Sequence, residues 1–214
     1  MTFASVYQIL TPLTTLRKTK SWYWFDGDAL RSIWTASTRR GSSINFVMVD
    51  AIDQGLEINF GVGDNIGALD QNNIRHYSET ASVIITMVKR ETGQIATRLT
   101  QIVSGFRNNA ADVVSSQNSM QNNSSLTFIR HLTSTQTGAS ATDTSVAVHG
   151  NFTTVKIECR SADCRLTLDG ILETTKTTNL PNARLQLEPL FLSTQGANAE
   201  TRRGRVRYCE AFST

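Results

Sequence analysis

The chain has 214 residues, of which 39% are hydrophobic and 18% are charged, and its formal net charge is +3. Its length suits one large domain, which all-β sandwiches often form as a single unit. The modest charge argues against a nucleic-acid-binding protein, and no apolar run approaches the roughly 18 residues that span a bilayer. Residues 1–15 also lack a basic segment followed by an apolar core, so we expect no signal peptide and synthesis in a cytoplasm.

The first twenty residues differ from the rest and are predicted to form an arm, residues 1–20, ahead of a main domain at residues 21–214. Pro12 and several threonines oppose a long helix there, so the type of structure stays open. An apolar arm must bury itself on its own domain or on a neighbouring molecule. Its large apolar residues are therefore candidate assembly contacts: Phe3, Tyr7, Leu10, Leu13 and Leu16.

Three adjacent aromatic residues, Trp22, Tyr23 and Trp24, open the main domain. On a strand, Trp22 and Trp24 share one face and Tyr23 lies on the other. One interpretation is a platform on which sugar rings stack. The other is that one face enters the core while the other covers an edge or the arm.

Further strand patterns occupy the middle of the chain, at residues 43–49, 56–60, 74–77, 82–88, 102–106 and 126–132. The 82–88 segment is the most continuous apolar run, which is typical of a central strand covered on both faces. Residues 108–125 are rich in Asn, Ser and Gln, and we predict a long surface loop there. Residues 133–143 are predicted to form a second flexible connection.

The C-terminal third alternates polar and apolar residues in segments separated by short turns, which is typical of antiparallel hairpins with one buried face. The first turn covers residues 160–163, and Asp169-Gly170 makes a second, because glycine tolerates the positive φ of tight turns. The predicted strands of this region lie at residues 152–159, 164–168, 172–179, 184–192 and 203–212.

This order of elements, with Leu168-Asp169-Gly170, Leu180-Pro181 and the terminal strand from Arg205 to Phe212, resembles the C-terminal half of a concanavalin A-like (laminin G-like) jelly roll. The resemblance reaches upstream to Trp24. Such domains are common in phage and viral structural proteins. We therefore expect an all-β, concanavalin A-like jelly-roll sandwich of two antiparallel sheets with an N-terminal arm.

Arg203, Arg205 and Arg207 concentrate positive charge on the last predicted strand. Strict alternation puts Arg205 and Arg207 on one face and Val206 and Tyr208 on the other. The arginines suit recognition of a phosphate or carboxylate. A solvated face, or pairing with acidic residues of a neighbouring subunit, is the interpretation that we favour because the net charge is modest, and we keep them as candidate assembly residues.

Three cysteines are present, and Cys159 and Cys164 flank the first turn, where they can face each other across the hairpin. A zinc site is not expected, because a fourth ligand and a second paired motif are missing. A disulfide would need an oxidising compartment. Buried free thiols, with Cys209 as the third, are the simpler interpretation, and the disulfide stays open.

No pattern in the chain indicates catalysis or a cofactor. Some glycan hydrolases of this fold place two carboxylates on one strand face, and no predicted strand here carries such a pair. The histidines are scattered, and Asp64, Asp70 and Asp112 do not reproduce a calcium loop, so no metal is expected.

The resemblance implies a non-enzymatic virion structural protein, such as a capsid-decorating or capsid- or tail-associated subunit, found in the virion. Its partners would be copies of itself or other virion proteins, bound through the arm and the sandwich faces. The alternative is a lectin-like carbohydrate-binding module that holds glycans through Trp22, Tyr23 or Trp24 and the polar residues near 108–125.

Overall fold

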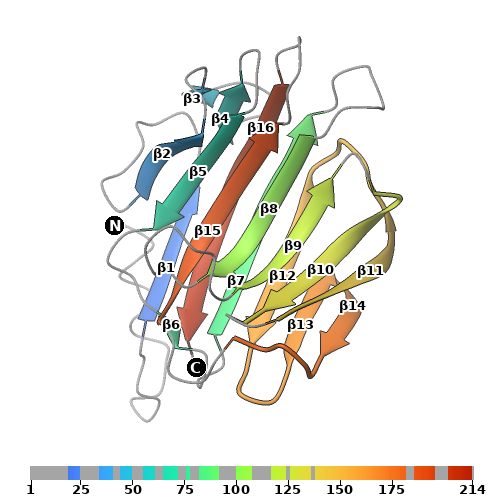
Figure 1. Cartoon of the computed structure of the whole chain (residues 1–214). Coiled ribbons are helices and arrows are strands. Elements are labelled where there is room, and N and C mark those ends of the chain that lie inside the picture. The colour runs from blue at the N-terminus through green and yellow to red at the C-terminus, as the bar shows by residue number, and fades with distance from the viewer. Residues whose placement is uncertain are drawn as a thin grey trace.

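The computed structural model describes residues 19–24, 34–40, 44–49, 55–60, 65–71, 76–77, 82–91, 100–107, 117–123, 126–135, 138–181, 186–195 and 202–213. All regular secondary structure in these ranges is β-strand, and the strands form two antiparallel sheets (Figure 1). None of the described residues belongs to a helix long and apolar enough to cross a membrane.

Sheet I has the strand order β14-β13-β12-β7-β16-β4-β3, and β1 pairs with the second half of β16. Its strands are β1 (Thr19–Trp24), β3 (Ile44–Val49), β4 (Gly55–Phe60), β7 (Ser82–Glu91), β12 (Thr153–Cys159), β13 (Cys164–Leu168), β14 (Ile171–Lys176) and β16 (Arg202–Ser213).

Sheet II has the order β11-β10-β9-β8-β15-β5-β2, and β6 pairs with β15. Figure 1 shows β15, in orange-red, running between β5 and β8. Its strands are β2 (Trp34–Arg40), β5 (Asn65–Gln71), β6 (His76–Tyr77), β8 (Thr100–Arg107), β9 (Gln117–Asn123), β10 (Phe128–Ser134), β11 (Ala139–Ala147) and β15 (Gln186–Gln195).

The predicted all-β sandwich of two antiparallel sheets is confirmed. The hairpin of β12 and β13 shows its cause most clearly, because their side chains alternate strictly between buried and half-buried. The apolar residues of this alternation enter the core, and the polar ones cover the outer face of sheet I. Strand β12 begins where this alternation of buried and half-buried residues begins. The turn at residues 160–163 is closed by a hydrogen bond of 2.9 Å, which Arg160 N donates to Asp163 O.

Two predicted loops are wrong. The 108–125 segment contains β9, and the 133–143 segment contains the first half of β11. The division into an arm and a main domain stays a prediction, since residues 1–18 lie outside the described ranges. β1 begins at Thr19, two residues before the predicted start of the main domain.

The core lies between the sheets and includes side chains of both. Phe106, Ile129 and Ile157 are completely buried there. The buried cluster consists of Leu56, Val88, Phe106, Met120, Ile129, Val155, Ile157, Cys159, Cys164, Leu166, Leu168, Val206, Cys209 and Ala211.

Polar groups also cross the interior, and they explain why a strand as polar as β9 is buried. Asn118 Nδ2 donates to the backbone oxygen of Glu158 at 3.0 Å, and Asn122 Nδ2 donates to that of His149 at 3.0 Å. Nearby, the hydroxyls of Thr86 and Ser104 lie 2.7 Å apart. Because each buried amide finds a partner on the facing element, β9 can be polar and interior.

Candidate functional site

A polar and aromatic surface lies on the outer face of sheet I. We call it the β16 face, and it consists of Met87, Phe152, Arg207, Tyr208 and Glu210. All five side chains are half-buried. They come from β7, from the residue before β12, and from β16, so strands distant in sequence assemble the surface.

A β-bulge in β16 places Arg207 on this face. The pairing with β7 shifts between Val206 and Tyr208, and Val206 and Cys209 both enter the core. The prediction that Val206 and Tyr208 share a face is therefore wrong, because the bulge inserts one residue into the alternation. The guanidinium carbon of Arg207 lies 4.1 Å from the centroid of the Phe152 ring. This is cation–π geometry, which attracts the guanidinium to the face of the ring.

Tyr208 and Glu210 supply the polar groups beside Arg207. The Tyr208 hydroxyl donates to Glu210 Oε2 at 2.8 Å. The Tyr208 ring and hydroxyl, a cation and a carboxylate thus lie within residues 207–210 of β16, and the Phe152 ring contacts the cation from just before the start of β12. Ligand sites combine apolar and aromatic walls with a few placed polar groups in this way.

The three aromatic residues predicted to bind glycans lie on the strand that borders this surface. The pairing of β1 with β16 sets Trp22 opposite Glu210, Tyr23 opposite Cys209 and Trp24 opposite Tyr208. The backbone therefore brings the predicted residues alongside the β16 face. Their side chains lie outside the described part of the structure, so their role stays a prediction.

The candidate assembly arginines have separate surroundings. Arg205 is 8% exposed and forms an ion pair with Glu57, which is 5% exposed, at 2.7 Å. The charge of Arg205 is therefore paired with that of Glu57 within the chain. Arg203 is opposite Asn59 of β4 and Glu91 of β7 by register. The arm residues named as assembly contacts, Phe3, Tyr7, Leu10, Leu13 and Leu16, lie outside the described residues.

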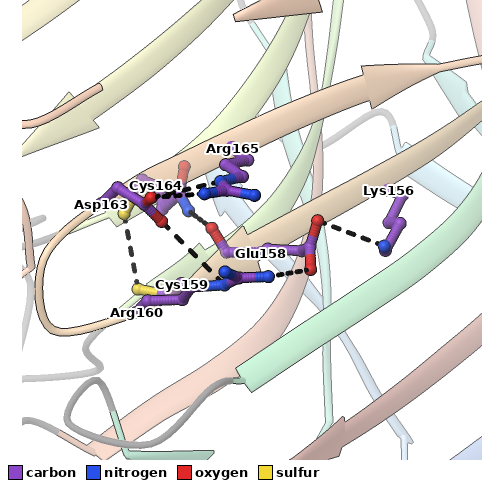
Figure 2. Close-up of polar contacts among 8 residues, drawn as sticks. Lys156, Glu158, Cys159, Arg160, Asp163, Cys164 and Arg165 are labelled. Atoms are coloured by element: carbon purple, nitrogen blue, oxygen red, sulfur yellow. Dashed lines mark hydrogen bonds and ion pairs between the residues drawn. The ribbon is translucent and has the colours of Figure 1, made fainter. Parts of the chain in front are cut away.

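The cysteines are all free and buried. Figure 2 shows Cys159 and Cys164 side by side at the end of the β12–β13 hairpin, with 3.6 Å between their sulfur atoms. The hydrogen bond with Cys159, together with burial, raises the pKa of the Cys164 thiol, and burial raises that of Cys209. The Cys164 and Cys209 thiols are therefore protonated and poor nucleophiles at neutral pH.

Ion pairs surround the same hairpin end (Figure 2). Glu158 receives Lys156 and Arg160, each at 3.1 Å, and Asp163 receives Arg165 at 2.8 Å. Burial opposes ionisation of Glu158, but the hydrogen bonds from Lys156 and Arg160 outweigh it and lower its pKa. Cations of the same hairpin thus compensate these carboxylates, and among the described residues no three potential ligands are placed to hold a metal ion.

His131 of β10 lies in the interior and is completely buried. Its Nε2 is 2.7 Å from Asn118 Oδ1, and its Nδ1 is 2.5 Å from Thr174 Oγ1. Because Asn118 Nδ2 donates to a backbone oxygen, its Oδ1 is the acceptor, so Nε2 carries the proton and the threonine hydroxyl donates to Nδ1. Burial, aided by the charge of Lys176, lowers the pKa of His131 to about 3. The ring is neutral and structural.

Comparison with known proteins identifies the fold. No family model and no curated protein matches the chain. Among solved structures, a Bacillus licheniformis β-glucanase is similar with a TM-score of 0.62 and 9% identity, covering 91% of this chain and 98% of its own. A family 16 glycoside hydrolase from a mixed-linkage glucan locus of Bacteroides ovatus has a TM-score of 0.63 and 8% identity, covering 90% and 99%. The carbohydrate recognition domain of Emp47p has a TM-score of 0.61 and 8% identity, covering 89% and 92%.

These neighbours confirm the concanavalin A-like jelly-roll fold, and they contradict the function that the sequence led us to expect. The prediction of a non-enzymatic virion structural protein is wrong: most of the similar structures are glucanases, and none of those compared above is a virion protein. The error arose because the strand order and turns of the C-terminal half specify the jelly roll, which proteins of unrelated function share.

Proposed function

We propose that this protein is carbohydrate-active and that it binds a glycan on the β16 face. The observation that carries the proposal is the grouping of Phe152, Arg207, Tyr208 and Glu210 in one half-buried patch. The named activities of the structural neighbours support the same ligand class, since they include glucanases and a carbohydrate recognition domain.

The chemistry of the patch suits a sugar. A pyranose presents an apolar C–H surface to an aromatic ring and hydroxyls at its rim. The Tyr208 and Phe152 rings offer apolar surface, the Glu210 carboxylate accepts hydrogen bonds, and the Arg207 guanidinium donates them. The hydrogen bond between Tyr208 and Glu210 and the contact of Arg207 with the Phe152 ring already hold these groups, which limits the conformational entropy lost on binding.

Affinity electrophoresis through gels that contain mixed-linkage β-glucan, β-1,3-glucan or mucin O-glycans tests the proposal. We expect retardation by at least one polysaccharide, and a Tyr208→Ala variant that binds about tenfold more weakly or worse, in the range of aromatic contact residues. Arg130→Gln is a matched control, because this arginine pairs with Asp143 on the other sheet, at 2.7 Å. It should bind like the unmodified protein.

Thermal unfolding of each variant accompanies the binding measurement, so that loss of the fold is not mistaken for loss of the ligand. Two results contradict the proposal. One is a protein that no polysaccharide in the panel retards. The other is a folded Tyr208→Ala variant that binds as tightly as the parent.

A further inference from the structure

Two of the three cysteines lie directly opposite each other in the hairpin of β12 and β13. The pairing register sets Cys159 opposite Cys164, and both side chains are completely buried, with 3.6 Å between their sulfur atoms. Figure 2 shows both sulfur atoms on the same side of the hairpin, at its end. The two thiols are therefore neighbours in the native fold, and no shift of one strand past the other is needed to join them.

The backbone geometry at this pair suits a disulfide. Arg160 N donates to Asp163 O across the turn at 2.9 Å, so the next pair inward, Cys159 with Cys164, is a non-hydrogen-bonded pair of the ladder. The Cα atoms of such a pair are about 4.5 Å apart. Disulfides join residues whose Cα atoms are about 4.4–6.8 Å apart. Rotation of the two side chains therefore suffices to form the bond while the backbone of the hairpin keeps its place.

The turn between the two cysteines is incompletely bonded in the thiol form. Arg160 Nε and Asp163 Oδ1 are both buried and have no hydrogen-bond partner, although these two atoms lie only 4.0 Å apart. Buried polar groups are normally paired, so this end of the hairpin has room to tighten. A covalent bond between the cysteines would hold the two strand ends together and favour the missing hydrogen bond.

The strand order excludes the third cysteine from this pair. Cys209 lies on β16, which β7 separates from β12, and β13 is one strand farther away. Because neighbouring strands are about 4.7–4.9 Å apart, the backbone of Cys209 is about 9 Å or more from that of either other cysteine. This distance exceeds the span of a disulfide. Within one chain the bond can therefore form only between Cys159 and Cys164.

We infer that Cys159 and Cys164 are a disulfide site: in an oxidising environment they bond to each other and lock the end of the β12–β13 hairpin. The oxidant is a low-molecular-weight disulfide such as oxidised glutathione. The inference does not rest on the proposed function, since Phe152 of the β16 face precedes the opposite end of β12.

The bond forms by two thiol–disulfide exchanges. The thiolate of one cysteine attacks a sulfur of the small disulfide, whose S–S bond breaks and releases one thiol. The thiolate of the other cysteine then attacks the protein sulfur of this mixed disulfide and releases the second thiol. The released thiols take up the two protons that the cysteines lose, so the protein is oxidised and the small disulfide is reduced. Because both cysteines are completely buried, we expect exchange while the hairpin end is open, as it is during folding.

The test refolds the full chain from urea in a mixture of reduced and oxidised glutathione, blocks the remaining thiols with iodoacetamide and maps the tryptic peptides without reduction. Trypsin cuts after Lys and Arg, so the paired cysteines fall in separate peptides, residues 157–160 and 161–165. We expect these two peptides joined, and the peptide of residues 208–214 blocked at Cys209. The oxidised protein should unfold roughly 4–8 °C above the reduced protein, as for a disulfide that closes a short loop in a chain of this size.

Cys209→Ala is the matched control, because it removes a buried thiol outside the pair, and it should keep both the joined peptides and the difference in unfolding temperature. Cys164→Ala should abolish that difference, and if this variant does not fold, the peptide map of the parent decides. Separate peptides 157–160 and 161–165, each blocked by iodoacetamide, overturn the inference. A joined peptide that contains Cys209 also overturns it, as do equal unfolding temperatures of the oxidised and reduced parent.

Discussion

The interior histidine makes the stability of this protein depend on pH. The pKa of His131 lies at about 3 in the folded chain, against 6.5 ordinarily. Between these values the unfolded chain binds a proton that the folded chain does not, so stability is complete above pH 6.5 and is lost as the pH falls. Each pH unit corresponds to about 1.4 kcal/mol. This site alone should therefore remove about 2 kcal/mol of the free energy of unfolding between pH 7 and pH 5.

Urea denaturation at several pH values between 7 and 4 measures the effect. The His131→Gln variant should show a weaker dependence of the free energy of unfolding on pH, whatever the substitution itself costs in stability. The ring resonances of His131 should not titrate above pH 4. Lys176→Met is a matched variant, because the charge of Lys176 helps to lower this pKa, and its loss should raise the pKa. The reasoning is refuted if His131→Gln keeps the parent's slope, or if His131 titrates near its ordinary value.

Two further predictions concern the framework of the sheets. Glu57→Gln should lower the free energy of unfolding by about 3–5 kcal/mol, measured by urea denaturation, because it breaks the buried ion pair between Glu57 and Arg205. The double change Glu57→Leu with Arg205→Met should recover most of this loss, and a double variant as unstable as the single one would contradict the prediction. Gly105→Ala should prevent folding, since its Cβ would lie 2.2 Å from the backbone oxygen of Asn118. At Gly170 φ is 87°, but nothing lies within 4 Å of an added Cβ, so Gly170→Ala should lower the free energy of unfolding by only about 1–2 kcal/mol. Equal losses of stability in the Gly105→Ala and Gly170→Ala variants would count against the packing argument.

Sequence reasoning located the C-terminal strands because their physical signals are local. The predicted strand at residues 152–159 is β12, Thr153–Cys159, and the one at 203–212 is β16, Arg202–Ser213. In β12 every second residue is buried, so the period of the sequence is the period of the structure. The turn at Asp169-Gly170 could also be predicted from a local signal, since glycine tolerates the positive φ of tight turns. Both residues have positive φ in the structure.

β9 could not be predicted in this way, because its burial depends on partners in other strands. Asn118 and Asn122 look like loop residues until the backbone oxygens of Glu158 and His149 accept their hydrogen bonds. The bulge at Arg207 was hidden for a related reason. Strict alternation predicts one face for Val206 and Tyr208, whereas the insertion of a single residue against β7 separates them.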